Sequence, residues 1–172
     1  MTEDDVFTQT GEIYLRLIDP VRPGDGYQPV IAPLLALAPS LPPGIVSQMI
    51  VGHSWRERLL GLSLAMAKCP EKHVDEMLNS LYDVRGISIV PTCAALAVLA
   101  RHALFDAEQL ASGTFDRSVF DGEVGWAIDQ AIRYAETQSV SACERGPNYG
   151  QSFVHQVELY EWIMSGQQDS AT

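Results

Sequence analysis

The chain has 172 residues, of which 47% are hydrophobic, and a formal net charge of −11. This length fits one domain with one core, and the hydrophobic fraction excludes a disordered chain. The excess of 22 acidic over 11 basic residues repels phosphate and anionic lipid, which argues against nucleic-acid and membrane-surface binding. Residues 103–172 hold eleven acids and three bases, so we expect a basic or neutral protein partner there.

Cysteine use and the N-terminal sequence indicate the compartment. The three cysteines, Cys69, Cys93 and Cys143, are odd in number and lack Cys-x-x-Cys spacing, which is typical of free thiols in a reducing environment. The first residues lack a basic stretch, and no apolar run approaches ~18 residues, so neither a signal peptide nor a membrane span is expected. The sequence therefore predicts a cytoplasmic protein.

Apolar residues at helical spacing predict a first helix over residues 3–18, with Thr2 as its N-cap. The alternation of Ile13, Leu15 and Leu17 leaves a short strand open as an alternative. Prolines and glycines in residues 19–26 predict a loop. Two short helices are expected next, at 28–38 and 45–51.

The central stretch runs from Ser54 to His102. Ser54 and Glu57 have the spacing of a capping box, which predicts that a helix begins at Trp55 and continues to Lys68. Gly61 in its middle costs ~1 kcal/mol of helix propensity relative to alanine, so we expect a neighbouring helix to approach closely there.

The rest of this stretch predicts a helical hairpin. An amphipathic helix over residues 71–83 is followed by one over 87–104 that is apolar nearly all round and should lie in the core. Superposing residues 61–64 on 95–98 gives a period of ~34 residues, within the range of helical-hairpin repeats. A third unit would use residues 123–138 as its inner helix.

The C-terminal part contains a polar loop over residues 139–152 and a final helix over 153–164. Residues 167–172 are expected to form a flexible tail. The predicted fold is therefore all-α: one domain over residues 1–166, in which seven or eight helices form hairpins stacked in a short solenoid-like bundle.

The run Trp55-Arg56-Glu57-Arg58-Leu59 resembles the inner helix of HEAT-like repeats. Together with the earlier run from Glu12 to Leu17, it is similar to an uncharacterised bacterial family of small HEAT-like helical-repeat proteins, over roughly the first two thirds of the chain. The resemblance implies an all-helical solenoid-like fold. It also implies a binding or toxin-immunity role, and it brings no catalytic residues with it.

Two histidine–glutamate pairs could bind metal in principle. His73 with Glu76 and His155 with Glu158 each place an imidazole and a carboxylate on one helix face. Carboxylate-bridged bundles use the order Glu-x-x-His with further glutamates, which is absent here. We therefore interpret these pairs as exposed helix polarity and predict no metal site. His102 is expected near a helix C-terminus, where the helix dipole favours a cation.

No catalytic motif is recognisable. Cys93 lies in the dry helix without an adjacent base, so its thiol should be inert. Cys143 lies beside Arg145, which would favour the thiolate, although an incidental loop cysteine is the preferred interpretation. The sequence therefore predicts no catalytic residue and no cofactor, and enzymatic activity stays an open, less favoured option.

Arg56 and Arg58 raise the question of nucleic acid, because HEAT-like DNA glycosylases bind DNA through basic inner surfaces. Residues 54–102 contain six bases and five acids, far from a phosphate-binding stripe. We therefore expect these arginines to pair with acids of an adjacent repeat.

The candidate partner-binding surface is centred on Trp126. On a helical wheel this residue points away from the buried stripe, so it is either an exposed anchor rimmed by acids or packed under the last helix, which is preferred. The predicted surface comprises Trp126, Asp121, Glu123, Asp129, Glu144, Arg145, Tyr149, Glu158 and Glu161.

The favoured hypothesis is a non-catalytic protein-interaction module, such as an immunity-type inhibitor that occludes a basic partner. The alternative is a small-molecule-binding protein or enzyme with a pocket between helical repeats, using Arg56, Arg58, Tyr82 or Cys143. A third hypothesis is an oligomerisation module, which includes a homodimer.

Overall fold

The computed structural model describes residues 2–18, 28–83, 85–111, 116–120, 122–139 and 147–168. These ranges contain no strand, and eight of their α-helices have at least seven residues, which confirms the predicted all-α fold of seven or eight helices. The α-helices are α1 (Glu3–Thr10), α2 (Ile13–Ile18), α3 (Gln28–Leu37), α4 (Pro43–Ile50), α5 (Trp55–Met66), α6 (Val74–Tyr82), α7 (Ile89–Arg101), α8 (Gly122–Thr137) and α9 (Pro147–Gln168). Short 3-10 helices are η1 (Ala38–Ser40), η2 (Pro70–His73), η3 (Gly86–Ser88), η4 (Ala107–Leu110) and η5 (Arg117–Val119).

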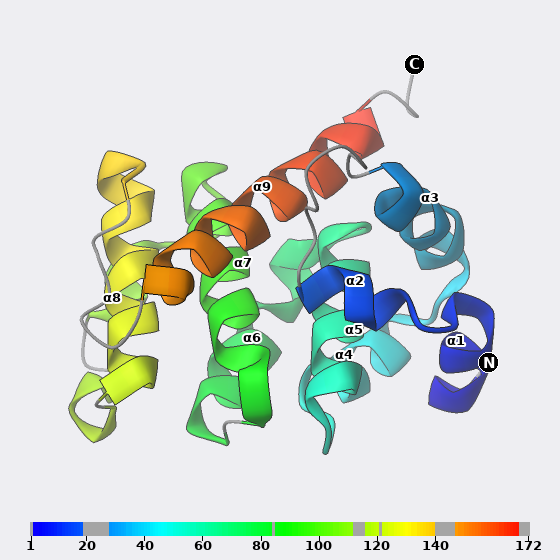
Figure 1. Ribbon diagram of the computed structural model, residues 1–172, viewed down its shortest axis with the longest axis horizontal. Coiled ribbons are helices and arrows are strands. Elements are labelled where there is room, and N and C mark those ends of the chain that lie inside the picture. The colour runs from blue at the N-terminus through cyan, green and yellow to red at the C-terminus, as the bar shows by residue number, and fades with distance from the viewer. Residues whose placement is uncertain are drawn as a thin grey trace.

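Helix α7 is the centre of the bundle. It packs against α8 on one side and α9 on another, and it also contacts α5 and α6 (Figure 1). Every residue from Ile89 to Leu99 is buried, as expected for a helix that is apolar nearly all round. Helix α9 runs obliquely across the front of the bundle from the α8 end towards α3, so it covers several helices at once (Figure 1).

Helix α5 begins and packs as its sequence predicts. The Ser54 side chain accepts a hydrogen bond from the Glu57 amide at 3.2 Å, and the Glu57 carboxylate accepts one from the Ser54 amide at 2.9 Å. A Cβ atom on Gly61 would lie 2.8 Å from the backbone nitrogen of Ile50 in α4. The close approach of a neighbouring helix at Gly61 is therefore confirmed.

The N-terminal segment differs from its prediction. The single helix expected over residues 3–18 is two helices, because Gly11 has a φ of +56° and ends α1, with its amide bonded to the Phe7 carbonyl. Glycine adopts this left-handed conformation without the steric cost that a side chain would add. Residues from Ile13 are helical again in α2, so the strand alternative is also wrong.

The C-terminal helix is longer than predicted. It begins at Pro147, so residues 147–152 of the predicted loop are helical, and it continues to Gln168, two residues into the predicted tail. Proline is well accepted at the first position of a helix, where its missing N–H has no partner to lose. Residues 140–146 and 169–172 lie outside the described residues.

Candidate functional site

A cavity of about 810 Å³ opens where η2, the first turn of α6, the end of α7, η4 and the last turns of α8 meet. We call it the groove. Most of its lining is apolar, formed by Val74, Ala100, Ala103, Leu104, Phe105, Ala107, Ala111, Ile132 and Ala135. The remaining lining residues are Gln109 and five carboxylates, Glu71, Asp75, Asp106, Glu108 and Glu136.

The turn after α7 forms one wall of the groove. Ala103 has a φ of +56°, and the amide of Leu104 bonds back to the Leu99 carbonyl at 2.9 Å, so the chain reverses sharply at the helix end. The Asp106 carboxylate then accepts a hydrogen bond from the Glu108 amide at 3.0 Å and caps η4. This turn leaves the Leu104 side chain 40% exposed although it belongs to an apolar wall. A ligand bound in the groove would cover this exposed leucine, and removing its apolar surface from water would favour binding.

The described lining residues of the groove carry charge of one sign. They include no lysine, arginine or histidine. None of the five groove carboxylates forms an ion pair with a base among the residues that the structure describes. The described part of the groove therefore combines an apolar lining with unpaired negative charge.

Glu161, a predicted partner-binding residue, already has partners within the chain. Its carboxylate lies 2.6 Å from Arg101 Nη1 and 2.8 Å from His102 Nε2. The Arg101 guanidinium also lies over the Tyr134 ring, 5.4 Å from its centroid. Glu161 thus joins α9 to the end of α7, where His102 is the C-cap residue, as its sequence position predicted.

Trp126 packs under the last helix, which was the preferred interpretation. It is half-buried, and its ring meets Phe153 of α9 edge to face at a centroid distance of 6.3 Å. Glu123 and Asp129 are exposed on α8, and Glu158 is exposed on α9.

The remaining residues of the predicted surface add no described contact. Asp121, Glu144 and Arg145 lie outside the described residues, whereas Tyr149 belongs to α9. Trp126, Glu123, Asp129, Glu158 and Glu161, the members of the predicted set with described side chains, are not among the lining residues of the groove.

Sequence reasoning missed the groove because its acids come from three separate segments. Glu71 and Asp75 precede α7 in the chain, Asp106 and Glu108 follow it, and Glu136 ends α8. The one local signal is the mixture of apolar and acidic residues from Leu104 to Glu108 directly after a core helix.

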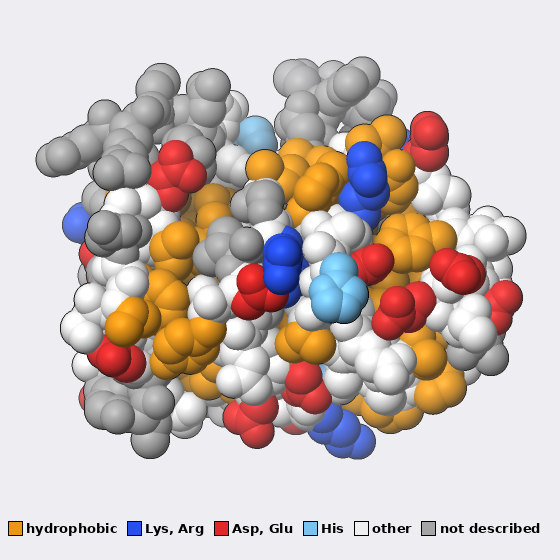
Figure 2. All heavy atoms as spheres, turned by 90° about the horizontal axis from the view of Figure 1, so that it is seen from below, with side chains coloured by type: hydrophobic (Ala, Val, Ile, Leu, Met, Phe, Trp, Pro, Cys, Tyr) orange, Lys and Arg blue, Asp and Glu red, His pale blue; other side chains and the backbone are white. Residues whose placement is uncertain are grey.

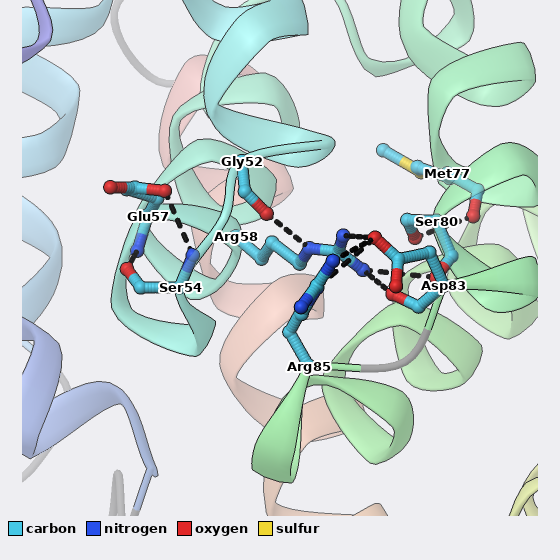
Figure 3. Close-up of polar contacts among 8 residues, drawn as sticks. All are labelled: Gly52, Ser54, Glu57, Arg58, Met77, Ser80, Asp83 and Arg85. Atoms are coloured by element: carbon cyan, nitrogen blue, oxygen red, sulfur yellow. Dashed lines mark hydrogen bonds and ion pairs between the residues drawn. The ribbon is translucent and has the colours of Figure 1, made fainter.

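Arg58 has a structural role at the other end of α6 (Figure 3). Its side chain is 1% exposed, and its guanidinium donates to the carbonyls of Gly52 (2.8 Å), Ser80 (3.0 Å) and Asp83. Its Nη2 also lies 3.2 Å from the Asp83 carboxylate. Burial lowers the pKa of Arg58, and the Asp83 charge opposes that shift. The predicted pairing with an acid of the next hairpin is thus found for Arg58.

Arg56 behaves differently from Arg58. Its guanidinium lies 5.0 Å from the Trp55 ring centroid and 5.5 Å from that of Tyr14, so it contacts aromatic rings where an acid was expected. Tyr14 also meets Trp55 edge to face at 5.7 Å. These contacts fasten α2 to the start of α5.

Apolar side chains are also exposed outside the groove. Figure 2 shows one face of the molecule on which they form separate areas divided by acidic, basic and histidine side chains. The ring of Tyr82, one of the exposed aromatic residues, packs against that of Phe120 in a tilted arrangement with the centroids 5.2 Å apart. Its hydroxyl accepts a hydrogen bond from the Asp116 amide at 3.0 Å. The groove differs from these areas because its described residues combine a hollow with charge of one sign.

The histidines of the predicted metal-binding pairs have other surroundings in the structure. Across the described ranges, no group of three or more potential ligands could hold a metal ion. His73 was expected to be exposed but is 2% exposed, and its Nδ1 lies 3.1 Å from Ser47 Oγ, so it links η2 to α4. Burial lowers the pKa of His73. Cys93 is buried as predicted, and Cys143 lies outside the described residues.

Comparison with known proteins does not assign the chain to a family. None of the described helices is both long and apolar enough to cross a membrane. No family model, curated protein or solved structure matches the chain.

Proposed function

We propose that this protein is a non-catalytic interaction module that binds a basic partner protein in the groove. The observation that carries the proposal is the set of five carboxylates that, among the described residues, have no basic partner and share the groove with apolar side chains. A protein that keeps like charges together in a hollow loses stability through their repulsion, which a cationic ligand would relieve. The role is that of an immunity-type inhibitor, which covers the basic surface of its target.

The two parts of the groove would act at different stages of binding. The negative field would attract the partner and speed association, by up to about 10³-fold at low salt for strongly complementary surfaces. The apolar lining would then provide most of the lasting affinity as Leu104 and its neighbours leave water. Inhibition would follow by occlusion, because basic side chains held in the groove cannot reach a phosphate or another acidic target.

A cationic peptide tests the location. The probe is a fluorescein-labelled 14-residue peptide of lysine, leucine and alanine, whose binding to the full chain is measured by fluorescence anisotropy at several salt concentrations. The test variant carries Asp75→Asn and Glu136→Gln in the groove. The matched control carries Asp4→Asn and Glu12→Gln, which removes the same charge from the exposed surface of the N-terminal segment.

We expect the groove variant to bind at least ~10-fold more weakly at 50 mM salt, whereas the control changes by less than about twofold. Screening should shrink the difference as salt rises. Equal losses in both variants would show that net charge, and not the groove, attracts the peptide. Absence of binding by the unmodified chain would count against the proposal itself.

A small organic cation is the second candidate ligand, because a volume of about 810 Å³ lies within the range of small-molecule sites. Spermine serves as the probe in a thermal-shift measurement. A ligand present at 100 times its dissociation constant stabilises a protein by ~2.7 kcal/mol. Stabilisation by spermine that disappears in the groove variant, without peptide binding, would favour this alternative.

A further inference from the structure

Small side chains are frequent in the lining of the groove. Five of its lining residues are alanines, at positions 100, 103, 107, 111 and 135. Small residues at a contact allow a helix backbone to come close, as Gly61 of α5 does for α4 within this chain. A lining rich in methyl groups therefore suits the side chains of an approaching helix better than it suits one large anchor residue.

The volume of the groove sets the length of such a segment. A helix with its side chains is about 10 Å across, so a cylinder of about 810 Å³ is roughly 10 Å long. At 1.5 Å per residue this corresponds to about seven residues, or two turns. A helix that also projects above the rim would be somewhat longer.

An extended segment fits the groove less well. Its backbone N–H and C=O groups would need partners when the groove covers them, and extended peptides usually find these at the open edge of a sheet. The described residues form helices and no strand, so they offer no such edge. A helix satisfies its own backbone groups and needs only side-chain contacts.

The positions of the groove acids indicate where the ligand helix would carry basic residues. Glu71 lies in η2 and Asp75 in the first turn of α6, whereas Glu136 lies in the last turn of α8 and Asp106 and Glu108 lie at η4. The carboxylates therefore come from separate segments around the groove, which they line together with the apolar residues. The complementary ligand has one apolar stripe flanked by lysine or arginine.

We propose that the groove binds a basic amphipathic helix of a partner protein, with about two turns in contact, apolar residues at i, i+3 or i+4 and i+7, and basic residues on both flanks. This inference rests on the proposed function, since it names the kind of segment that the groove takes. It requires that the ligand be helical when bound, whatever its conformation in solution.

Selection from random 14-residue peptides displayed on phage tests the inference with the full chain as target. The blocked target carries Ala111→Arg, at an exposed lining position next to η4. The matched control carries Gln9→Arg on the exposed surface of α1, which adds the same charge elsewhere. Far-ultraviolet circular dichroism confirms that both variants fold.

We expect the recovered peptides to be rich in lysine and arginine, with apolar residues three or four positions apart. Synthetic versions should bind Ala111→Arg at least tenfold more weakly than Gln9→Arg. Proline at the centre of a recovered peptide should weaken binding by roughly 100-fold, because proline breaks a helix interior, whereas proline at its first position should have little effect.

The outcomes separate the inference from the proposed function. If basic peptides lose binding to Ala111→Arg but tolerate a central proline, the ligand is not a helix, whereas the proposed basic partner still stands. Recovery of no basic peptide, or equal binding to the blocked and control targets, would overturn both.

Discussion

Replacing Arg58 by alanine should be the most damaging single change in the α4 to α6 region. Three backbone carbonyls accept hydrogen bonds from this buried guanidinium, and each such bond contributes about 1 kcal/mol or more when the donor is charged. Removing the side chain also leaves a cavity and a buried Ser80 carbonyl without this donor. We expect a loss of about 3–5 kcal/mol in the free energy of unfolding.

Urea denaturation followed by circular dichroism at 222 nm measures this loss by linear extrapolation. Arg58→Lys should cost less than alanine but still ~2 kcal/mol, because one ammonium group cannot reach both the Gly52 carbonyl between α4 and α5 and the carbonyls at the end of α6.

Two further variants control for the ion pair. Asp83→Asn and Arg85→Ala should each cost under ~1 kcal/mol, because the Asp83 side chain is 58% exposed and the Arg85 side chain 44% exposed. If Asp83→Asn destabilised as much as Arg58→Ala, the ion pair and not the carbonyl contacts would be the main stabilising interaction, and our reasoning would be wrong.

Gly61→Ala should lower the free energy of unfolding by about 1–2 kcal/mol, because its Cβ would lie 2.8 Å from the Ile50 backbone nitrogen. Gly44→Ala should raise it by up to ~1 kcal/mol, because no neighbouring atom lies within 4 Å of the added Cβ. Urea titrations of the two variants measure both changes. Burial lowers the pKa of His73, so below about pH 6.5 the unfolded chain binds a proton that the folded one resists. The urea midpoint should therefore fall from pH 7 to pH 5, and this fall should diminish in His73→Asn. Glu136→Gln should raise the melting temperature by about one or two degrees at low salt. The substitution removes a carboxylate from the last turn of α8, where the helix dipole is unfavourable to anions. An unchanged melting temperature would contradict this account.

The elements best predicted from sequence are those with local signals. The start of α5 was predictable from two capping side chains three residues apart. The burial of α7 was predictable from its composition, because a helix that is apolar on all sides has no polar face to expose to solvent. The close contact at Gly61 was likewise predictable, because a glycine in a helix interior needs a packing reason.

The errors have physical causes of their own. Apolar spacing continued across Gly11, so the pattern gave no sign that the backbone changes direction there. The turn-forming composition of residues 147–152 concealed the start of α9, although a proline such as Pro147 is well accepted at the first position of a helix. His73 was interpreted as exposed because its neighbours are polar, yet Ser47, distant in the sequence, provides its partner.

The candidate site was the least predictable part. Charge counting located the acidic excess in residues 103–172, but Glu71 and Asp75 of the groove lie outside that region. Glu161 had the expected charge and is paired with Arg101 and His102. Whether a carboxylate is paired depends on which helices are neighbours, which composition does not reveal.

The path of α9 has a consequence for how the chain folds. The side-chain amide of Gln156 donates to the carbonyl of Leu17, a contact between residues 139 positions apart. Phe153 and Tyr160 of the same helix are fully buried. During synthesis the hairpins from α4 to α7 can form from local contacts, whereas α2 acquires this partner only after Gln156 has emerged, 139 residues later. Closure of the core is therefore a late step in folding. Until α9 packs, the apolar surface that it will cover on the nascent chain stays exposed to solvent.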